Sequence, residues 1–203
     1  MGFTHIDCFS GPGGICTGLH AAGFETKVAI EFIKSCVDTY SKNHPEVHVI
    51  HSDIRNVSKE QILPFIPKGG IDLVTSGMPC ETFSTAGNTS RSFYDDRQFL
   101  FREGIRIAEI VNAKLILFEN VPAITTKTVS KDSNELIVSV LKEELKEAGM
   151  VISKNLFFVL QILEFLKHVK DFLFLLQKIQ QLNYLHQHQL VKKLLPCKMP
   201  SQD

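Results

Sequence analysis

Residues 7–14 read DCFSGPGG and join a run of apolar residues at 3–9 to an amphipathic stretch at 14–22. Three glycines in this turn let the backbone bend sharply and approach a ligand closely before a helix begins. The N-terminus of such a helix favours an anion. The spacing differs from G-x-G-x-x-G, because Cys16 stands where the third glycine is required. A tight strand-to-helix turn without a ligand is therefore the alternative interpretation.

The alternation of short apolar runs with longer amphipathic stretches continues to residue 149. It predicts an α/β fold, a doubly wound and mostly parallel sheet with helices on its faces. Ligands of such sheets bind beyond the carboxyl ends of the strands. The expected strands are 3–9, 27–31, 47–51, 71–76 and 114–119, and the expected helices are 14–22, 34–43, 58–65, 97–112 and 133–148.

Bulk composition narrows the class of protein. With 203 residues, 44% of them apolar, the chain can bury one domain. Lys and Arg number 22, as do Asp and Glu, so no overall basic excess indicates nucleic acid and any DNA contact must be local. Five cysteines lack metal-ligand spacing, so no metal is expected. Without a signal-peptide pattern or an apolar run of about 20 residues, we expect a cytoplasmic protein that does not contact membranes.

Acidic residues close the next two expected strands. Glu31 ends the second strand about 20 residues after the glycine-rich turn, where an acid can accept hydrogen bonds from both ribose hydroxyls. Asp53 follows the third strand and could accept an adenine amino group. Separately, each is typical of a solvated loop acid. Together with the turn they favour a nucleoside ligand.

A thiol and a second carboxyl group follow the fourth and fifth strands. The fourth runs into GMPCETFSTAG at residues 77–87, in which Pro79 stiffens the backbone next to Cys80. The fifth leads into Glu119, Asn120 and the following Val-Pro. A lone cysteine is usually a small buried hydrophobic residue. Its place at the ligand-bearing edge favours a functional role instead.

Residues 7–14, 77–87 and 118–122 closely resemble three signature motifs of the DNA (cytosine-5) methyltransferases. The resemblance covers roughly residues 3–150 and includes the segment 96–100. It implies a Rossmann-like methyltransferase fold with S-adenosylmethionine as methyl donor and no metal. One departure is Glu81, where the family most often has glutamine; we expect it to alter local hydrogen bonding rather than the reaction class.

The resemblance also implies roles for individual residues. Cys80 would add to cytosine C6, Glu119 would hydrogen-bond or protonate N3, and Asn120 and Pro79 would hold the catalytic loop. The methionine carboxylate would meet the helix that follows Gly14. The residues expected at the cofactor are Phe9, Ser10, Gly11, Gly13, Gly14, Glu31, Phe32, Asp53, Ile54, Pro79 and Leu100.

The implied partner is double-stranded DNA with the target cytosine flipped out of the helix. A bacterial or phage restriction-modification system would be the setting, with a cognate restriction endonuclease. Two readings stay open: an enzyme, active alone or with a second polypeptide that supplies missing parts, and an inactive fragment that at most binds S-adenosylmethionine. A nicotinamide dehydrogenase is disfavoured because the glycine spacing fails and Pro79-Cys80 would be unexplained.

Residues 151–203 differ in composition from residues 1–150. We take residues 1–150 as the cofactor-binding catalytic domain. All twelve glycines precede Met150, and no arginine follows Arg106. The family's further strand, its Gln-x-Arg-x-Arg motif, its DNA-reading domain and its returning C-terminal helix are not expected here, so the sheet is predicted to be incomplete. One or two native amphipathic helices are the alternative for this segment.

A change of reading frame accounts for the tail. Permitted codons for residues 158–172, read from the third base, encode CASDFGIPQTRKRF, which contains the missing motif. We therefore predict a frameshift between about Met150 and Phe158. Sequencing the encoding DNA is expected to find codons that give this string in the shifted frame. Codons that do not give it would exclude the frameshift.

Overall fold

The structure is a computed structural model that describes residues 2–79, 96–150 and 158–159. The chain divides into two units, Met1–Gln161 and Ile162–Asp203, and all described residues belong to the first. Cys80 and Glu81 lie outside the described residues, as does nearly all of the predicted frameshifted tail. Within the described ranges, no helix is both long and apolar enough to cross a membrane.

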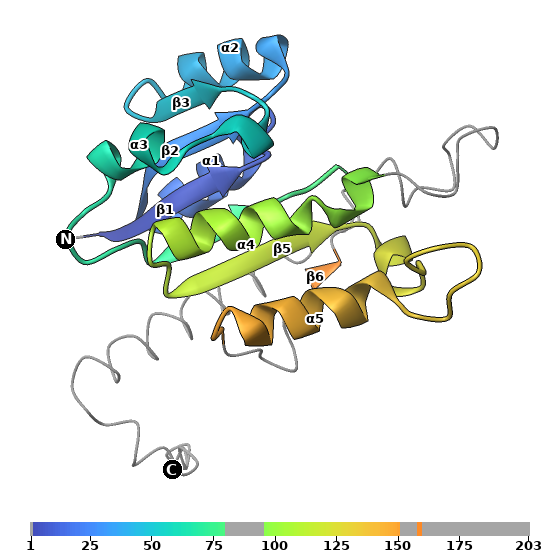
Figure 1. The fold of residues 1–203 in the computed structure, drawn as a ribbon. Coiled ribbons are helices and arrows are strands. Elements are labelled where there is room, and N and C mark those ends of the chain that lie inside the picture. The colour runs from blue at the N-terminus through green and yellow to red at the C-terminus, as the bar shows by residue number, and fades with distance from the viewer. Residues whose placement is uncertain (1, 80–95, 151–157, 160–203) are drawn as a thin grey trace, which may run out of the picture. The chain divides into compact units, whose positions relative to one another are not determined.

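Six parallel strands form the sheet, in the order β3-β2-β1-β4-β5-β6, with helices between them along the chain (Figure 1). This confirms the predicted doubly wound α/β fold. The strands are β1 (Phe3–Cys8), β2 (Phe24–Glu31), β3 (His48–His51), β4 (Leu73–Ser76), β5 (Leu115–Asn120) and β6 (Phe158–Val159). The α-helices are α1 (Gly14–Ala21), α2 (Lys34–Asn43), α3 (Lys59–Ile62), α4 (Phe101–Ile110) and α5 (Ile137–Glu147).

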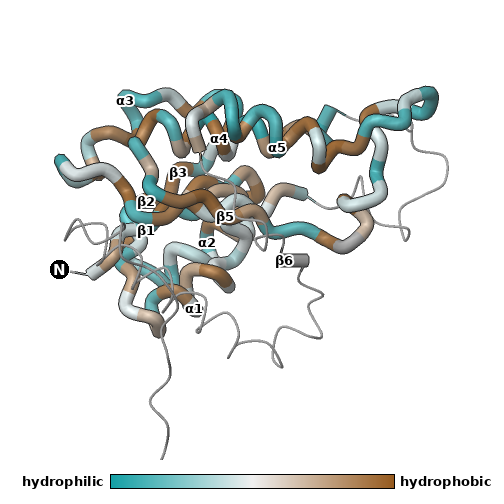
Figure 2. The backbone as a smooth tube through the Cα atoms, turned by 90° about the horizontal axis from the view of Figure 1, so that it is seen from below, coloured by the Kyte–Doolittle hydropathy of each residue, from teal (hydrophilic) through white to brown (hydrophobic). Residues whose placement is uncertain are grey.

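The sheet lies between two helical layers, with α1 and α2 on one face and α3, α4 and α5 on the other (Figure 2). Alternate residues of β1 therefore enter different environments. Ile6 and Cys8 join an apolar cluster with Ile107 of α4. His5 and Asp7 are equally buried but polar, and they belong to the α1–α2 face. The strand order reverses direction between β1 and β4, which is where ligands bind in such sheets.

Three predicted helices are shorter than expected. The stretch 97–112 divides into a 3₁₀ turn, Asp96–Phe99, and α4, and the other two shorten for local reasons. The stretch 58–65 divides into α3 and a 3₁₀ turn, Leu63–Phe65. Pro64 lacks the amide hydrogen that an α-helix would require there. In the stretch 133–148 the helix starts only at Ile137, because the preceding residues pair in extended form, with a bridge from Thr128 to Leu136.

The sixth strand corrects part of the expectation for the C-terminal region. Phe158 and Val159 pair in parallel with Glu119 and Asn120 at the end of β5. The sequence prediction ended the sheet with the strand at 114–119. A bare strand edge offers unpaired amide and carbonyl groups to any extended segment, and the apolar pair at 158–159 occupies it.

A buried polar network crosses the sheet beneath the glycine-rich turn. The Thr75 hydroxyl donates to the Asp7 carboxyl group at 2.8 Å, and the Tyr40 hydroxyl donates to it at 3.4 Å. The Nε2 atom of His5 lies 2.8 Å from Thr75 Oγ1, and its Nδ1 lies 2.9 Å from Thr26 Oγ1. Since Thr75 uses its proton on Asp7, His5 donates from Nε2 and accepts at Nδ1. Burial lowers the pKa of His5 to about 3, which keeps this imidazole neutral.

Asp7 makes stability depend on pH. Its burial raises the pKa of the carboxyl group to about 7, although the hydrogen bonds from Thr75 and Tyr40 act in the opposite direction. An acid with a raised folded-state pKa stabilises the fold when protonated, and this stabilisation is lost as pH rises through the folded pKa. We expect the free energy of unfolding to fall by about 2 kcal/mol between about pH 5 and pH 7 from this group.

Asp7→Asn should remove that dependence, measured by urea unfolding at both pH values. Asp72→Asn is the matched control. Burial raises the pKa of Asp72, but hydrogen bonds from Lys114 and Thr4 outweigh it and hold the pKa below its usual 3.8. The contribution of Asp72 therefore changes only below that pH, and this variant should keep the wild-type slope. An unchanged slope in Asp7→Asn would contradict the assignment.

Candidate active site

The turn after β1 is built from left-handed backbone. Phe9, Gly11 and Gly13 have φ angles of 57°, 54° and 98°. The amide of Ser10 donates to the carbonyl of Ile30 in β2 at 3.2 Å, and the amide of Gly13 donates back to the Ser10 carbonyl at 3.2 Å. The turn is thus folded tightly against the end of β2. Gly13 then caps the N-terminus of α1.

Glu31 holds this turn from the neighbouring strand. Its carboxylate accepts hydrogen bonds from the amide of Gly11 at 2.8 Å and from the amide of Ile33 at 2.7 Å. The side chain is almost fully buried. The sequence predicted only a ribose acceptor at this position. An ionised carboxylate has about four acceptor sites, so two remain beyond the two amides.

An exposed ring follows the second strand, and a paired acid follows the third. The Phe32 side chain is 68% exposed, directly after Glu31. Asp53 accepts from both the amide and the Nε of Arg55 at 3.0 Å, and these hydrogen bonds hold the pKa of Asp53 below its usual range. Ile54 next to it is buried. The predicted adenine acceptor is therefore already ion-paired.

Arg106 positions this segment from α4 and was not predicted. Its Nη2 donates to the carbonyl of Ile54 at 2.7 Å, and its Nη1 donates to the carbonyl of Val57 at 2.9 Å. Glu103 accepts from its Nε at 2.7 Å. The sequence signal for this role was a basic residue within the apolar pattern of a helix. The two carbonyl groups that it binds are 49 and 52 residues away in the chain, so the sequence alone could not identify them.

Asn120 connects the end of β5 to the segment that leads to Cys80. Its Nδ2 donates to the carbonyl of Met78 at 3.1 Å, and its Oδ1 accepts from the amide of Val121 at 2.8 Å. The amide of Gly77 donates to the carbonyl of Cys8 at 3.3 Å. Pro79 follows and is half-buried. These bonds fit the loop-holding role expected of Asn120.

Glu119 lies beside both loops. A Cβ placed on Gly77 would be 3.5 Å from the Glu119 carboxylate and 3.9 Å from the carbonyl oxygen of Phe9. Among the described residues this carboxylate has no hydrogen-bond partner, and burial raises its pKa. Phe9 and Leu100 pack against one apolar cluster, which contains Met78 and Phe101. The turn after β1, the segment after β4 and the acid of β5 therefore meet at one edge.

A family model for C-5 cytosine-specific DNA methylases matches residues 3–160. The chain belongs to this family. The match extends ten residues past residue 150, into β6.

Curated relatives agree with the family. The chain is 36% identical over 137 residues to the Type II methyltransferase M1.HphI of Haemophilus parahaemolyticus, covering 67% of this chain and 37% of that one. It is 38% identical over 144 residues to M.FnuDI of Fusobacterium nucleatum, covering 71% and 38%. The chain thus spans under two fifths of the length of these two relatives.

Solved structures agree with the fold. A prophage-encoded E. coli protein described as a DNA modification methyltransferase is 26% identical with a TM-score of 0.54, covering 72% of this chain and 37% of that one. A Spodoptera frugiperda DNMT2 variant is 22% identical with a TM-score of 0.51, covering 72% and 41%. The latter likeness concerns the fold alone.

The glycine-rich turn after β1 fits the methyl donor that the family implies. Nothing lies within 4 Å of a Cβ placed on Gly11, so this side of the turn is open to a ligand, and a helix N-terminus follows. The buried Ser10 hydroxyl has no hydrogen-bond partner in the described part of the chain. A buried hydroxyl without a partner is costly, so a polar group of a bound ligand next to the turn would satisfy it.

Gly13 is expected to be irreplaceable in this member of the family. A Cβ at Gly13 would lie 2.9 Å from His44 Cδ2 and 3.1 Å from Tyr40 Cδ2, and the φ of 98° strains any other residue. We expect Gly13→Ala to lower the free energy of unfolding by roughly 1–3 kcal/mol. Gly18→Ala is the matched control, because nothing lies within 4 Å of its Cβ position within α1. It should gain roughly 0.5–1 kcal/mol, and chemical denaturation measures both variants.

Proposed function

We propose that this chain binds S-adenosylmethionine and carries the cytosine-activating residues of a DNA (cytosine-5) methyltransferase of a restriction-modification system. The observation that supports this best is the edge shared by the glycine-rich turn, the Gly77–Pro79 segment and Glu119. A methyl donor in the turn and a base beside Glu119 would be neighbours there.

The cofactor would be held by three strand ends. The α1 N-terminus after Gly14 suits the methionine carboxylate. The remaining acceptor sites of Glu31 suit the ribose hydroxyls, and the exposed ring of Phe32 suits stacking on adenine. Asp53 can accept the adenine amino group if it shares its carboxylate with Arg55. When bound, S-adenosylmethionine supplies an electrophilic methyl group.

Cys80 and Glu119 would activate the base. Cytosine C5 is a weak nucleophile, so the Cys80 thiolate first forms a bond to C6, which breaks the C5–C6 double bond and makes C5 enamine-like. Protonation or hydrogen bonding at N3 by Glu119 draws electrons away from C6 and favours this attack. The raised pKa of Glu119 increases its protonated fraction at a given pH, which suits that role.

The remaining steps restore the base. C5 takes the methyl group, and S-adenosylhomocysteine is the leaving product. A base then removes the proton from C5, the bond between C6 and the Cys80 sulfur breaks, and the C5–C6 double bond reforms. Since C6 is inaccessible in a stacked duplex, the cytosine must be flipped into the site. Asn120 would keep the Cys80 loop in place through the Met78 carbonyl.

Sequence readout needs residues that this chain lacks if its tail is frameshifted. We propose that activity depends on their supply, by the restored reading frame or by a second polypeptide. A cognate endonuclease would complete the restriction-modification system. The alternative is a non-catalytic chain that binds S-adenosylmethionine. It predicts cofactor binding without any transfer of the methyl group to DNA.

Methyl transfer from labelled S-adenosylmethionine to unmethylated mixed-sequence DNA tests the proposal. We expect the frame-restored protein to transfer label and Cys80→Ser to abolish transfer. Glu119→Gln should lower kcat by about 10²-fold to 10⁴-fold without weakening S-adenosylmethionine binding, because only its proton is lost. Cys36→Ser and Glu109→Gln are the matched controls and should behave like the parent protein.

The 203-residue chain is assayed in parallel, with calorimetric titration of S-adenosylmethionine. We expect it to bind the cofactor and to transfer no label. Glu31→Gln should weaken that binding, since it loses the charge and one acceptor oxygen. Label transfer by the 203-residue chain would show that this chain is active alone and that the residues of the restored frame are dispensable. Failure of the frame-restored protein to transfer label to any DNA would overturn the proposed reaction.

A further inference from the structure

A cysteine and two histidines lie together on the α1–α2 face of the sheet, and none of them has a part in the proposed reaction. Cys16 and His20 are one turn apart on α1, and His44 is the residue that ends α2. One donor atom from each of the three lies within 4.8 Å of the other two. Cys16 and His44 are buried, and His20 is half-buried.

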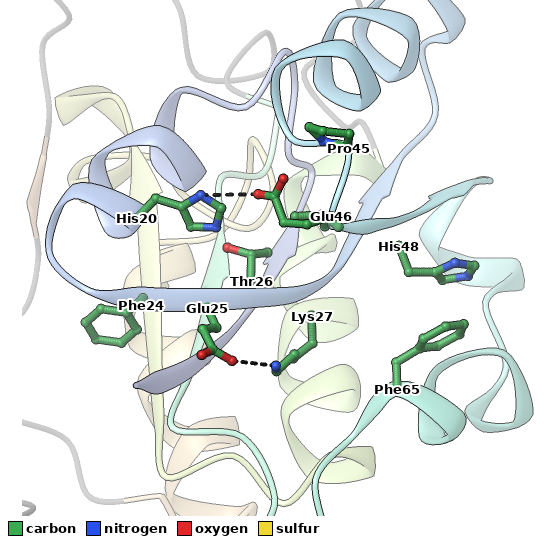
Figure 3. A pocket seen from close by; sticks show the side chains of 10 residues that line it. His20, Phe24, Glu25, Thr26, Lys27, Pro45, Glu46, His48 and Phe65 are labelled. Carbon is green, nitrogen blue, oxygen red and sulfur yellow. Dashed lines mark hydrogen bonds and ion pairs between the residues drawn. The ribbon is translucent and has the colours of Figure 1, made fainter. Parts of the chain in front are cut away.

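The contacts around His20 assign its two nitrogens to different partners. Its Nε2 lies 3.7 Å from the Cys16 sulfur. Its Nδ1 lies 3.4 Å from the Glu46 carboxylate, the contact drawn as a dashed line in Figure 3. Histidines that bind metals usually donate their other ring nitrogen to a carboxylate. His20 has this arrangement if Nε2 faces the metal.

Hydrogen-bond donors determine the tautomer of His44. The Thr17 hydroxyl donates its proton to the carbonyl of Gly13 at 2.9 Å, and it lies 3.1 Å from His44 Nε2. Thr17 can therefore only accept from His44, so Nε2 carries the hydrogen. In a neutral imidazole Nδ1 then has a free lone pair. This nitrogen faces the Glu46 carboxylate at 3.9 Å, so two acceptors face each other and a cation between them would satisfy both.

The donor set selects the kind of cation. A thiol and two imidazoles, with one carboxylate beside them, suit Zn²⁺ and not Mg²⁺ or Ca²⁺, which prefer oxygen ligands. Zinc distances of about 2.3 Å to sulfur and about 2.0 Å to nitrogen put tetrahedral ligands on the order of 3.5 Å apart. Side-chain movements of about 1 Å would close the present group to that size. With thiolate and carboxylate as ligands or neighbours, the charge of the ion is balanced.

The surroundings of the group allow a metal ion to enter and the Cys16 thiol to lose its proton. His20, Glu46 and Thr26 line an open pocket, so an ion can reach the group from solvent (Figure 3). The Cys16 thiol now donates to Thr26 Oγ1 at 3.2 Å. The Thr26 hydroxyl uses its own proton on His5 Nδ1, so the thiolate that zinc binding would produce exchanges its bond to Thr26 for the bond to the ion.

We propose that Cys16, His20 and His44 form a zinc-binding site, with Glu46 as the fourth ligand or as the orienting partner of His20. The site ties the end of α2 to α1 and reaches the glycine-rich turn through Thr17 and Gly13. Its role is structural: the ion stabilises the helix that begins at that turn. This does not depend on the proposed methyl transfer.

Metal titration of the chelator-treated 203-residue protein tests the site. Co²⁺ is expected to bind once in this group and to give a near-ultraviolet thiolate-to-cobalt absorption band that Zn²⁺ displaces. Cys16→Ser should abolish the band. Glu46→Gln should weaken Zn²⁺ binding on the order of tenfold to 100-fold, and His20→Gln, which removes a ligand, should weaken it at least as much. Zn²⁺ should raise the Tm of the parent protein and leave that of Cys16→Ser unchanged.

Matched variants separate this site from other ligands in the chain. Cys36→Ser and His48→Gln should bind Co²⁺ and Zn²⁺ as the parent protein does. Should Cys16→Ser not fold, judged by circular dichroism, the surface variants Glu46→Gln and His20→Gln decide instead. A cobalt band that persists in Cys16→Ser, parent-like Zn²⁺ affinity in both surface variants, or no binding of either ion would overturn the proposal.

Discussion

The hydrogen bond from the Gly11 amide to the Glu31 carboxylate connects the two structural elements on which the site depends. The Gly11 amide donates to no group of its own turn, and a buried carboxyl group is costly without hydrogen-bond donors. The hydrogen bond between them removes the free-energy cost of burying either group without a partner. With the second bond, from Ile33, one side chain fixes the turn after β1 and the exit from β2. Phe32 lies between Glu31 and Ile33 in the chain, with its ring exposed.

Asn120 has the corresponding role on the other half of the sheet. Its amide group bonds to the carbonyl of Met78 and to its own neighbour Val121, so the ends of β4 and β5 are held together. Glu119 precedes it with a carboxyl group that has no partner among the described residues and a raised pKa. Both polar atoms of the Asn120 side chain are hydrogen-bonded, whereas the Glu119 carboxyl group has no such partner in the described part of the chain. Neighbouring residues at the end of one strand therefore have opposite hydrogen-bonding states.

Local patterns predicted the fold well, because each strand-loop-helix unit carries its own signals. The turn at residues 7–14, the strand ends and the acids that follow them needed no knowledge of distant contacts, whereas β2 begins at Phe24 and not at the predicted residue 27. The sequence did not reveal that Glu31 holds the turn or that Arg55 pairs with Asp53, since side-chain geometry decides both. The Cys16, His20 and His44 group was missed for a different reason. Its spacing has no motif, because the return of the chain after α2 brings His44 to α1.

The strand order also implies an order of assembly during synthesis. The first strand made, β1, lies in the middle of the sheet, and β2 and β3 extend it outward on one side before β4 exists. The other side grows later as β4, β5 and β6 emerge in turn from the ribosome. The half with the glycine-rich turn and Glu31 can therefore pair while the nascent chain still lacks Glu119. Until Phe158 and Val159 are translated, β5 leaves the growing sheet with an open edge that chaperones or another nascent chain could bind.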